Sequence, residues 1–356
     1  MGLIWKSITV PQSELQLHKV LRCGQAFRWK NINNIWSSSL GHKVVFLRQE
    51  NDKIHYASLP HSEDALDTIK DYFNLSINVT DLYTQWMKTD PVFRKTAVGF
   101  EGVRMLRQDP WENLVSFICS SNNNIKRISQ MCDNLCLHFG DHIATHEGIE
   151  YFSFPTPKVL AEAGVEQRLR DLSFGYRAKY IHKTAQLVLD SPEGHLDNLR
   201  TVPYEKAHEE LLKFTGVGPK VADCVCLMSL DKHDSIPVDT HVYQIAKRDY
   251  KLKSKGDAVT AKTYDLVRKL FVDMWGPYAG WAQSVAFAAD LKDMNNGLNQ
   301  VNGDTVKVEV VTKKRTVTKK VIAKDEMVEK VKEEEAELEY SITGRPKRRK
   351  TIKVEY

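Results

Sequence analysis

The sequence predicts an α+β protein, in which an N-terminal antiparallel β-sheet domain precedes a larger all-helical body that contains a helix-hairpin-helix. Three observations predict this fold class. Residues 25–58 alternate in the manner of strands, most of residues 62–293 follow the helical period, and a Gly-Val-Gly break separates two helical segments near residue 217. We therefore expect a sheet domain with flanking helices over residues 1–105 and a helical domain over 106–294.

The predicted sheet rests mainly on two alternating segments, residues 43–48 and 54–58. A polar turn at 49–52 separates them, which is the pattern of an antiparallel hairpin.

The first clear helix start is Asp109-Pro110-Trp111-Glu112. Asp109 is in the N-cap position of a capping box, and Pro110 falls at the first helical position, where its missing N–H costs nothing. Apolar residues at 111, 114, 115 and 118 then share one face of the predicted helix.

The net charge of +5 is unevenly distributed. Residues 301–356 hold 15 Lys/Arg and 11 Asp/Glu, which leaves 36 and 35 in the first 300 residues. A nearly neutral body can bind nucleic acid only through a local basic face and backbone donors. Residues 295–356 are rich in Lys and Glu and poor in aromatics, so we expect a disordered tail.

Composition also predicts the compartment. No membrane span or secretory signal is expected, and six scattered cysteines fit reduced intracellular thiols. The basic cluster at 344–350 predicts nuclear import, with a nonspecific phosphate-binding arm as the alternative, and a mitochondrial pool stays open.

The helix-hairpin-helix is expected at about residues 205–229, with helical segments at 205–214 and 220–228. Gly216 and Gly218 allow positive φ and leave backbone N–H groups uncovered at a helix N-terminus, where a phosphate is favoured. Such a hairpin can hold a DNA backbone without reading bases. An ordinary interhelical turn is the alternative.

Three side chains around this hairpin suggest chemistry. Lys220 starts the second helix, where the helix dipole and burial both favour the neutral amine that a nucleophile needs. Cys224 is four residues on, hence on the same face. Asp239 precedes a further amphipathic segment as an N-cap, and a purely structural cap is the alternative reading.

These residues resemble the helix-hairpin-helix DNA glycosylases, and within them the eukaryotic 8-oxoguanine DNA glycosylase/AP lyases. The resemblance covers about residues 10–293 and is carried by the hairpin with Lys220, by Pro237-Val238-Asp239 and by the segments 24–29, 102–110, 120–125, 175–180 and 275–283. It implies that Lys220 attacks the sugar of an extruded nucleotide and forms a Schiff base that permits β-elimination. It also implies that Asp239 stabilises positive charge developing on the sugar.

The resemblance also implies which residues recognise the damaged base. The Gly24 carbonyl accepts the ring N–H that oxidised guanine has and guanine lacks, Phe287 and Cys224 sandwich the base, and Gln283 bonds its Watson–Crick edge. Stacking on Phe287 contributes about 1–3 kcal/mol. Outside the pocket, the implied residues are those facing the orphaned cytosine (Asn122, Arg127 and Arg177), the wedge Tyr176, the backbone contacts Gly216, Gly218 and His241, and the carbonyls of Phe214 and Val217 for a hairpin cation.

Two departures from the family matter. Phe214-Thr215 stands where Leu-Pro is common, so the hairpin entry is less rigid and the cation site is in doubt. No four-cysteine cluster follows the hairpin, which argues against the branches with an iron–sulfur cluster, while Lys220 argues against the single-function alkylbase branch.

The resulting expectation is a monomeric base excision repair enzyme acting on duplex DNA that contains oxidised guanine, with no required cofactor. Formamidopyrimidine guanine is the expected second substrate. Three alternatives stay open: a glycosylase for another oxidised purine, a catalytically silent damage-binding protein, and a helical scaffold.

Overall fold

The computed structural model describes residues 2–254, 256 and 258–291. The expected tail at 295–356 and its basic cluster lie outside the described residues. The described sheet and helices belong to one compact unit.

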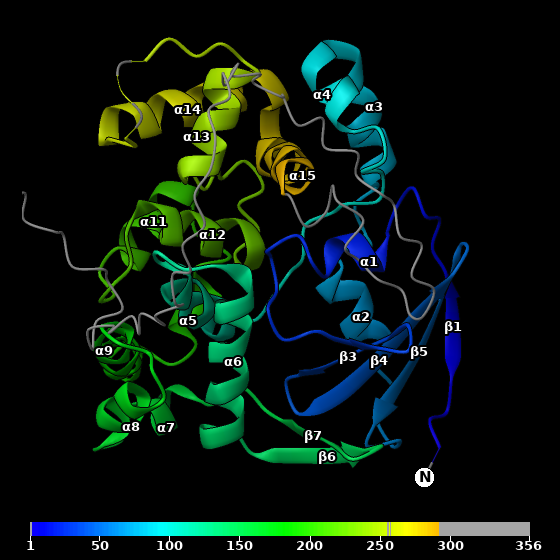
Figure 1. The fold of residues 1–356 in the computed structure, drawn as a ribbon, viewed down its shortest axis with the longest axis vertical. Helices are drawn as coiled ribbons and strands as arrows, with labels where there is room; N and C mark the ends of the chain where they lie inside the picture. The colour runs from blue at the N-terminus through cyan, green and yellow to red at the C-terminus, as the bar shows by residue number, and fades with distance from the viewer. Residues whose placement is uncertain (1, 255, 257, 292–356) are drawn as a thin grey trace, which may run out of the picture. The chain divides into compact units, whose positions relative to one another are not determined.

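Five strands form one antiparallel sheet in the order β1-β5-β4-β3-β2 (Figure 1). Their bounds are β1 Lys6–Thr9, β2 Lys30–Ile32, β3 Ile35–Leu40, β4 Lys43–Glu50 and β5 Lys53–Leu59. The predicted turn joins β4 to β5, where Glu50 pairs with Lys53 and Asn51 takes a left-handed φ of 51°. The predicted antiparallel sheet is confirmed.

Both faces of the sheet are buried, as the alternation along β4 explains. Val45 and Leu47 point to a core shared with α1 (Leu17–Val20) and α2 (Leu66–Tyr72). Val44 and Phe46 point to the opposite side, where they meet Tyr151.

Tyr151 belongs to a second, two-stranded sheet, β6 (His142–His146) and β7 (Ile149–Phe152). The expectation of helix through this part of 62–293 is therefore wrong. A two-residue Glu147-Gly148 turn, with φ values of 50° and 78°, closes a hairpin that local periodicity did not reveal. The hairpin is fixed to the main sheet by Ser39 Oγ, which donates to the Phe152 carbonyl at 2.7 Å.

The rest of the described chain is helical, as predicted. The remaining helices are α3 Val79–Thr89, α4 Pro91–Thr96, α5 Pro110–Ser120, α6 Ile125–Phe139, α7 Pro157–Leu160, α8 Val165–Asp171, α9 Arg177–Leu189, α10 His195–Asn198, α11 Tyr204–Leu211, α12 Pro219–Ser229, α13 Thr240–Arg248, α14 Ala261–Trp275 and α15 Ala279–Asp290. None of these described helices has the length and apolar character of a membrane span.

An extended segment, residues 103–109, connects the sheet to the helices and contains the predicted boundary at 105/106. The Arg104 side chain is buried and donates to the carbonyls of Glu14 and Ile77 at 3.0 and 2.7 Å. The Gln108 N–H donates to the Met228 carbonyl in α12 at 2.8 Å. The sheet region is thereby fixed to the helix that begins at the hairpin.

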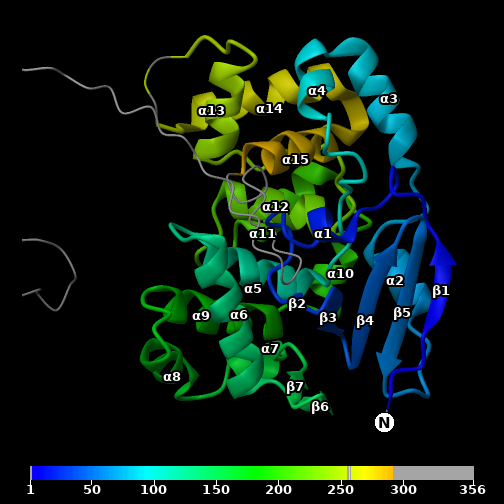
Figure 2. The same ribbon diagram turned by 45° about the vertical axis from the view of Figure 1, so that its right-hand side comes forward.

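Figures 1 and 2 show α12 among its neighbours in the helical body. It packs on α5 and on α11, while α15 packs on both α13 and α14. The helix that begins at the hairpin therefore lies against α5 and α11, and α13 lies against α15.

Candidate active site

The predicted hairpin is confirmed, with α11 ending at Leu211 and α12 beginning at Pro219. Gly216 has a φ of +83°, and a Cβ built on it would come within 2.5 Å of the Tyr180 ring. Both the backbone conformation and the close approach of Tyr180 therefore require glycine here.

Lys220 lies in the first turn of α12, half-buried against α5. Its Nζ is 3.5 Å from Ser120 Oγ and 4.8 Å from the centre of the Phe117 ring. Among the described residues no carboxylate forms an ion pair with this amine. Within the described part of the chain, the amine is therefore not held by a salt bridge.

Cys224 follows one turn later and is 2% exposed. Burial raises the pKa of its thiol to about 11, the Lys220 ammonium counteracts that shift, and the Asp239 carboxylate adds to it. Both charges act on one thiol, so the structure brings the three residues from the sequence together. A thiol with this pKa is neutral at pH 7, which fits an apolar contact and not a nucleophile.

The buried thiol predicts a pH-dependent contribution to stability. An unfolded cysteine has a pKa of about 8.5, so the neutral thiol stabilises the fold below that pH and loses its effect as pH rises toward 11. We expect the difference in free energy of unfolding between wild type and Cys224→Ala to shrink by about 2–3 kcal/mol between pH 8 and 11. Urea unfolding measures it, and a difference that does not vary with pH contradicts the assignment.

Asp239 is the N-cap of α13, as predicted, and its carboxylate accepts from the Val242 N–H at 2.9 Å. One carboxylate oxygen makes this bond, so capping alone does not exhaust the acceptors of the group. The cap holds the Asp239 carboxylate near Cys224, and its negative charge contributes to the raised pKa of that thiol.

The predicted damaged-base residues approach one another from distant parts of the chain. Gly24 has a φ of +85°, and a Cβ built on it would lie 3.6 Å from Phe287 in α15 and 3.6 Å from Ile125 at the start of α6. Gln283 is buried one turn before Phe287, on the same face of α15. The sequence did not single out Ile125 as a contact, because its apolar side chain reads as ordinary core.

A second cluster gathers the residues expected to face the opposite strand. The buried Arg177 donates to the carbonyls of Ser121 and Asn122, and no described residue forms a hydrogen bond with its Nε. Tyr176 donates to the same Ser121 carbonyl at 2.9 Å and lies 4.6 Å from the guanidinium. Asn122 has a φ of 49° at the tip of this turn.

Arg127 lies close by on α6, exposed, with Nη2 donating to the Ser173 carbonyl at 3.3 Å. All four predicted opposite-strand residues therefore surround the turn at 121–124 or its neighbouring loop. Which of them contacts a base stays a prediction.

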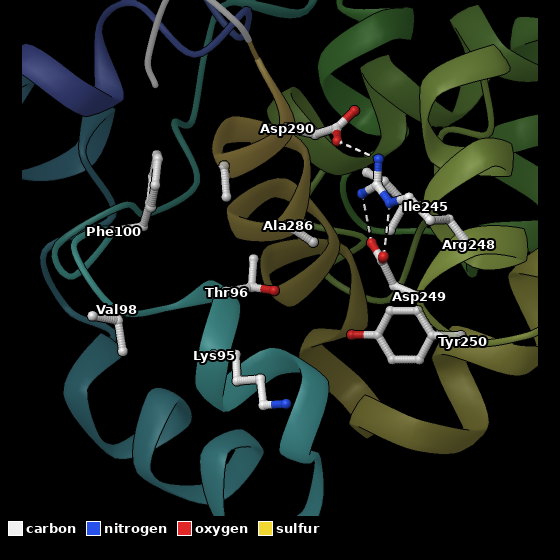
Figure 3. A pocket seen from close by; sticks show the side chains of 11 residues that line it. Lys95, Thr96, Val98, Phe100, Ile245, Arg248, Asp249, Tyr250, Ala286 and Asp290 are labelled. Atoms are coloured by element: carbon white, nitrogen blue, oxygen red, sulfur yellow. Dashed lines mark hydrogen bonds and ion pairs between the residues drawn. The ribbon is translucent and has the colours of Figure 1, made fainter. Parts of the chain in front are cut away.

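His241 is 60% exposed in the first turn of α13, with its ring centre 6.0 Å from that of Phe287. Its Nδ1 is 3.8 Å from Asp290, which also pairs with Arg248 at 2.9 Å. Figure 3 shows Arg248 held between Asp249 and Asp290 at a cavity of about 300 Å³. That cavity is lined from α4, α13 and α15, and Asp290 is the link from it to His241.

Some carbonyl oxygens of the hairpin already accept hydrogen bonds. Phe214 O accepts from the Val217 N–H at 3.2 Å, and the neighbouring Thr215 O accepts from Thr184 Oγ1 at 2.9 Å. A carbonyl has two lone pairs, so these bonds leave Phe214 O able to accept a second partner. Among the described residues, no group of three His, Cys, Asp or Glu side chains is arranged to hold a metal ion.

Comparisons with known proteins cover nearly the whole described chain. Residues 7–114 match the 8-oxoguanine DNA glycosylase N-terminal domain, and residues 115–277 match the HhH-GPD superfamily of base excision DNA repair proteins. The junction of the two matches falls inside α5.

The chain is 40% identical to the N-glycosylase/DNA lyase of Saccharomyces cerevisiae, over 82% of this chain and 87% of that protein. It is 39% identical to the Arabidopsis thaliana enzyme of the same name, over 81% of this chain and 80% of that protein. The fold matches the Clostridium acetobutylicum 8-oxoguanine glycosylase/lyase, solved with DNA containing cytosine opposite 8-oxoguanine. That match has a TM-score of 0.71, 30% identity and coverage of 83% of this chain and 99% of that one. Fold, site geometry and relatives agree, and the chain belongs to the 8-oxoguanine DNA glycosylase family of base excision repair enzymes, as a bifunctional N-glycosylase and DNA lyase.

Proposed function

We propose that this enzyme excises 8-oxoguanine opposite cytosine from duplex DNA and then cuts the strand 3′ to the lesion through a Schiff base on Lys220. The observation that carries the proposal is the grouping at the start of α12. The half-buried Lys220 amine, which forms no ion pair with any described residue, and the Asp239 carboxylate both act on the buried Cys224 thiol.

In the proposed reaction, the neutral Lys220 amine attacks the anomeric carbon C1′ of the extruded nucleotide. The bond from C1′ to the base breaks, its electron pair leaves with the base, and the base takes one proton from the new ammonium group at Nζ. The C1′–O4′ bond then breaks, the nitrogen lone pair forms the C1′=Nζ bond of a protonated Schiff base, and O4′ takes a proton from water. Loss of a 2′ proton expels the 3′ phosphate and cuts the strand.

Asp239 stabilises the positive charge that develops on the sugar while the base departs. Its carboxylate is held in place by the Val242 N–H at 2.9 Å, so no reorganisation is needed when the charge appears. Half-buried surroundings strengthen this interaction relative to water.

For lesion choice, we propose that the Gly24 carbonyl tests for the ring N–H of the oxidised base. A guanine in the same place would leave that carbonyl unpaired, which is what makes such a site selective. Phe287 and Ile125 lie within 3.6 Å of a Cβ built on Gly24, which supports a contact of Gly24 and Phe287 with the same base. Formamidopyrimidine guanine carries the same hydrogen and is the proposed second substrate.

For the opposite base, we propose that Asn122, Arg127 and Arg177 contact the orphaned cytosine while Tyr176 occupies the space beside it. The guanidinium of Arg177 offers several donors in a fixed geometry that matches cytosine acceptors, and no described residue accepts from its Nε.

Strand nicking tests the proposal on duplexes carrying 8-oxoguanine opposite C, A, G or T. We expect the single-turnover rate to favour C by at least about 10-fold in the wild type, and Arg177→Gln to reduce that preference to within about 3-fold, since a good base contact is worth about 1–3 kcal/mol. Arg127→Gln is the second variant, because its exposed side chain can be changed without risk to the core.

The control is Arg170→Gln, which removes an exposed arginine paired with Glu166 on α8 and should keep the wild-type preference. Tight binding without nicking would instead support a silent damage-binding protein. Equal rates opposite all four bases would contradict the opposite-strand assignment.

Three further proposals go with this function. We propose that the enzyme acts as a monomer without a required cofactor, and that any hairpin cation is held by the carbonyls of Phe214 and Val217, next to Gly216 and Gly218. A hard cation accepts such oxygen ligands, and it would add positive charge where a phosphate binds.

Residues 344–350 are proposed as a nuclear import signal on their basic composition.

A further inference from the structure

A fully buried carboxylate lies on α12 about one turn after Lys220. Asp223 is three residues after Lys220, and its side chain is 0% exposed. A buried charge is costly unless hydrogen bonds satisfy it, so its partners identify what the group does.

Asp223 is satisfied by hydroxyl groups from three separate elements. Tyr204 in α11 donates to Oδ1 at 2.7 Å, Ser235 donates to Oδ1 at 2.8 Å, and Tyr264 in α14 donates to Oδ2. His208 Nε2 lies 3.8 Å from Oδ1. The carboxylate thus joins α11, α12, α14 and the loop that leads to α13.

Tyr264 differs from the other donors because it reaches that loop. Its hydroxyl gives its one hydrogen to Asp223, and it accepts from the backbone N–H of Val238 at 3.3 Å. Burial and the Asp223 carboxylate raise the pKa of Tyr264, which keeps the hydroxyl protonated and able to donate. Val238 is the residue immediately before Asp239.

Ser235 fixes the other end of the same short loop. Its hydroxyl also lies 3.1 Å from the Asp223 carbonyl, and Ile236 and Val238 are buried. The backbone that carries Asp239 is therefore anchored twice to the helix that carries Lys220, once through Ser235 and once through Tyr264.

We infer that Tyr264 and Asp223 are positioning residues that hold the Asp239 carboxylate at a fixed position relative to the Lys220 amine. This inference rests on the proposed function, because it assumes that these two groups perform the reaction. Small displacements of catalytic groups cost large factors in rate, so the loss of one anchor should be measurable.

The test compares two isosteric variants. Tyr264→Phe and Tyr204→Phe each remove one hydroxyl donor from Asp223, but only Tyr264→Phe also leaves the Val238 N–H without its acceptor. We expect Tyr264→Phe to lower the single-turnover rate of base excision about 10-fold or more, with Kd for damaged duplex within about 2-fold of wild type. Tyr204→Phe should stay within about 3-fold of the wild-type rate.

A double mutant separates positioning from general destabilisation. If Tyr264 acts through Asp239, adding Tyr264→Phe to Asp239→Asn should cost no more than about 2-fold further, because the group being positioned is already disabled. Equal losses in Tyr264→Phe and Tyr204→Phe, or a full multiplicative loss in the double mutant, would overturn the inference. A wild type that does not excise 8-oxoguanine would instead overturn the proposed function, so the two failures are distinguishable.

Discussion

Lys220→Gln should abolish both base excision and covalent capture of DNA. Glutamine keeps the length and polarity of the side chain but has no amine to form a Schiff base. Since the nucleophile supplies the covalent step, we expect single-turnover nicking to fall by about 10³-fold or more. Trapping with borohydride should fall to the background level.

Lys213→Gln is the matched control. Lys213 belongs to the same hairpin region, but its side chain is 60% exposed and paired with Glu210 at 2.9 Å. This variant should trap and nick as the wild type does. Normal trapping by Lys220→Gln would show that another amine performs the chemistry.

Asp239→Asn should slow the reaction while leaving the fold intact. Asparagine caps a helix about as well as aspartate, so the bond to the Val242 N–H survives. Only the negative charge is lost, and removal of one such electrostatic contact costs about 10²–10³-fold in rate. Single-turnover excision and the melting temperature are the two measurements.

Asp109→Asn is the control for Asp239→Asn, because it makes the same change at the cap of another helix. Asp109 caps α5 through the Glu112 N–H at 2.8 Å, so the substitution changes the same kind of group outside the site. It should keep the wild-type rate. If Asp239→Asn is as active as Asp109→Asn, then Asp239 is a structural cap and nothing more.

The parts of the fold that the sequence predicted are those with local causes. The hairpin and the two aspartate caps depend on residues within a few positions of one another, and the model confirms them. The β6–β7 hairpin was missed because its short strands are only half-buried and show weak alternation.

Less of the site could be predicted from the sequence, because contacts between distant segments set its geometry. Nothing local to Gly24 indicates that it meets Phe287 in α15. The resemblance to known glycosylases named both residues, whereas periodicity could place each only on its own element.

Neither the family resemblance nor local periodicity predicted the hydroxyl groups that bind Asp223. Tyr204, Ser235 and Tyr264 each look like an ordinary polar residue in its own segment. Their common function becomes visible only when three elements bring their hydroxyl groups to one buried carboxylate. Polar networks of this kind depend on tertiary geometry, which no single-segment pattern encodes.

The proposed covalent bond between the Lys220 amine and DNA underlies the proposed reaction and both positioning variants. The most direct measurement is peptide mapping by mass spectrometry of the wild-type enzyme after borohydride reduction on an 8-oxoguanine duplex. We expect one modified peptide, with the reduced sugar adduct on Lys220. An adduct on another lysine or on the N-terminal amine, with Lys220 unmodified, would contradict it.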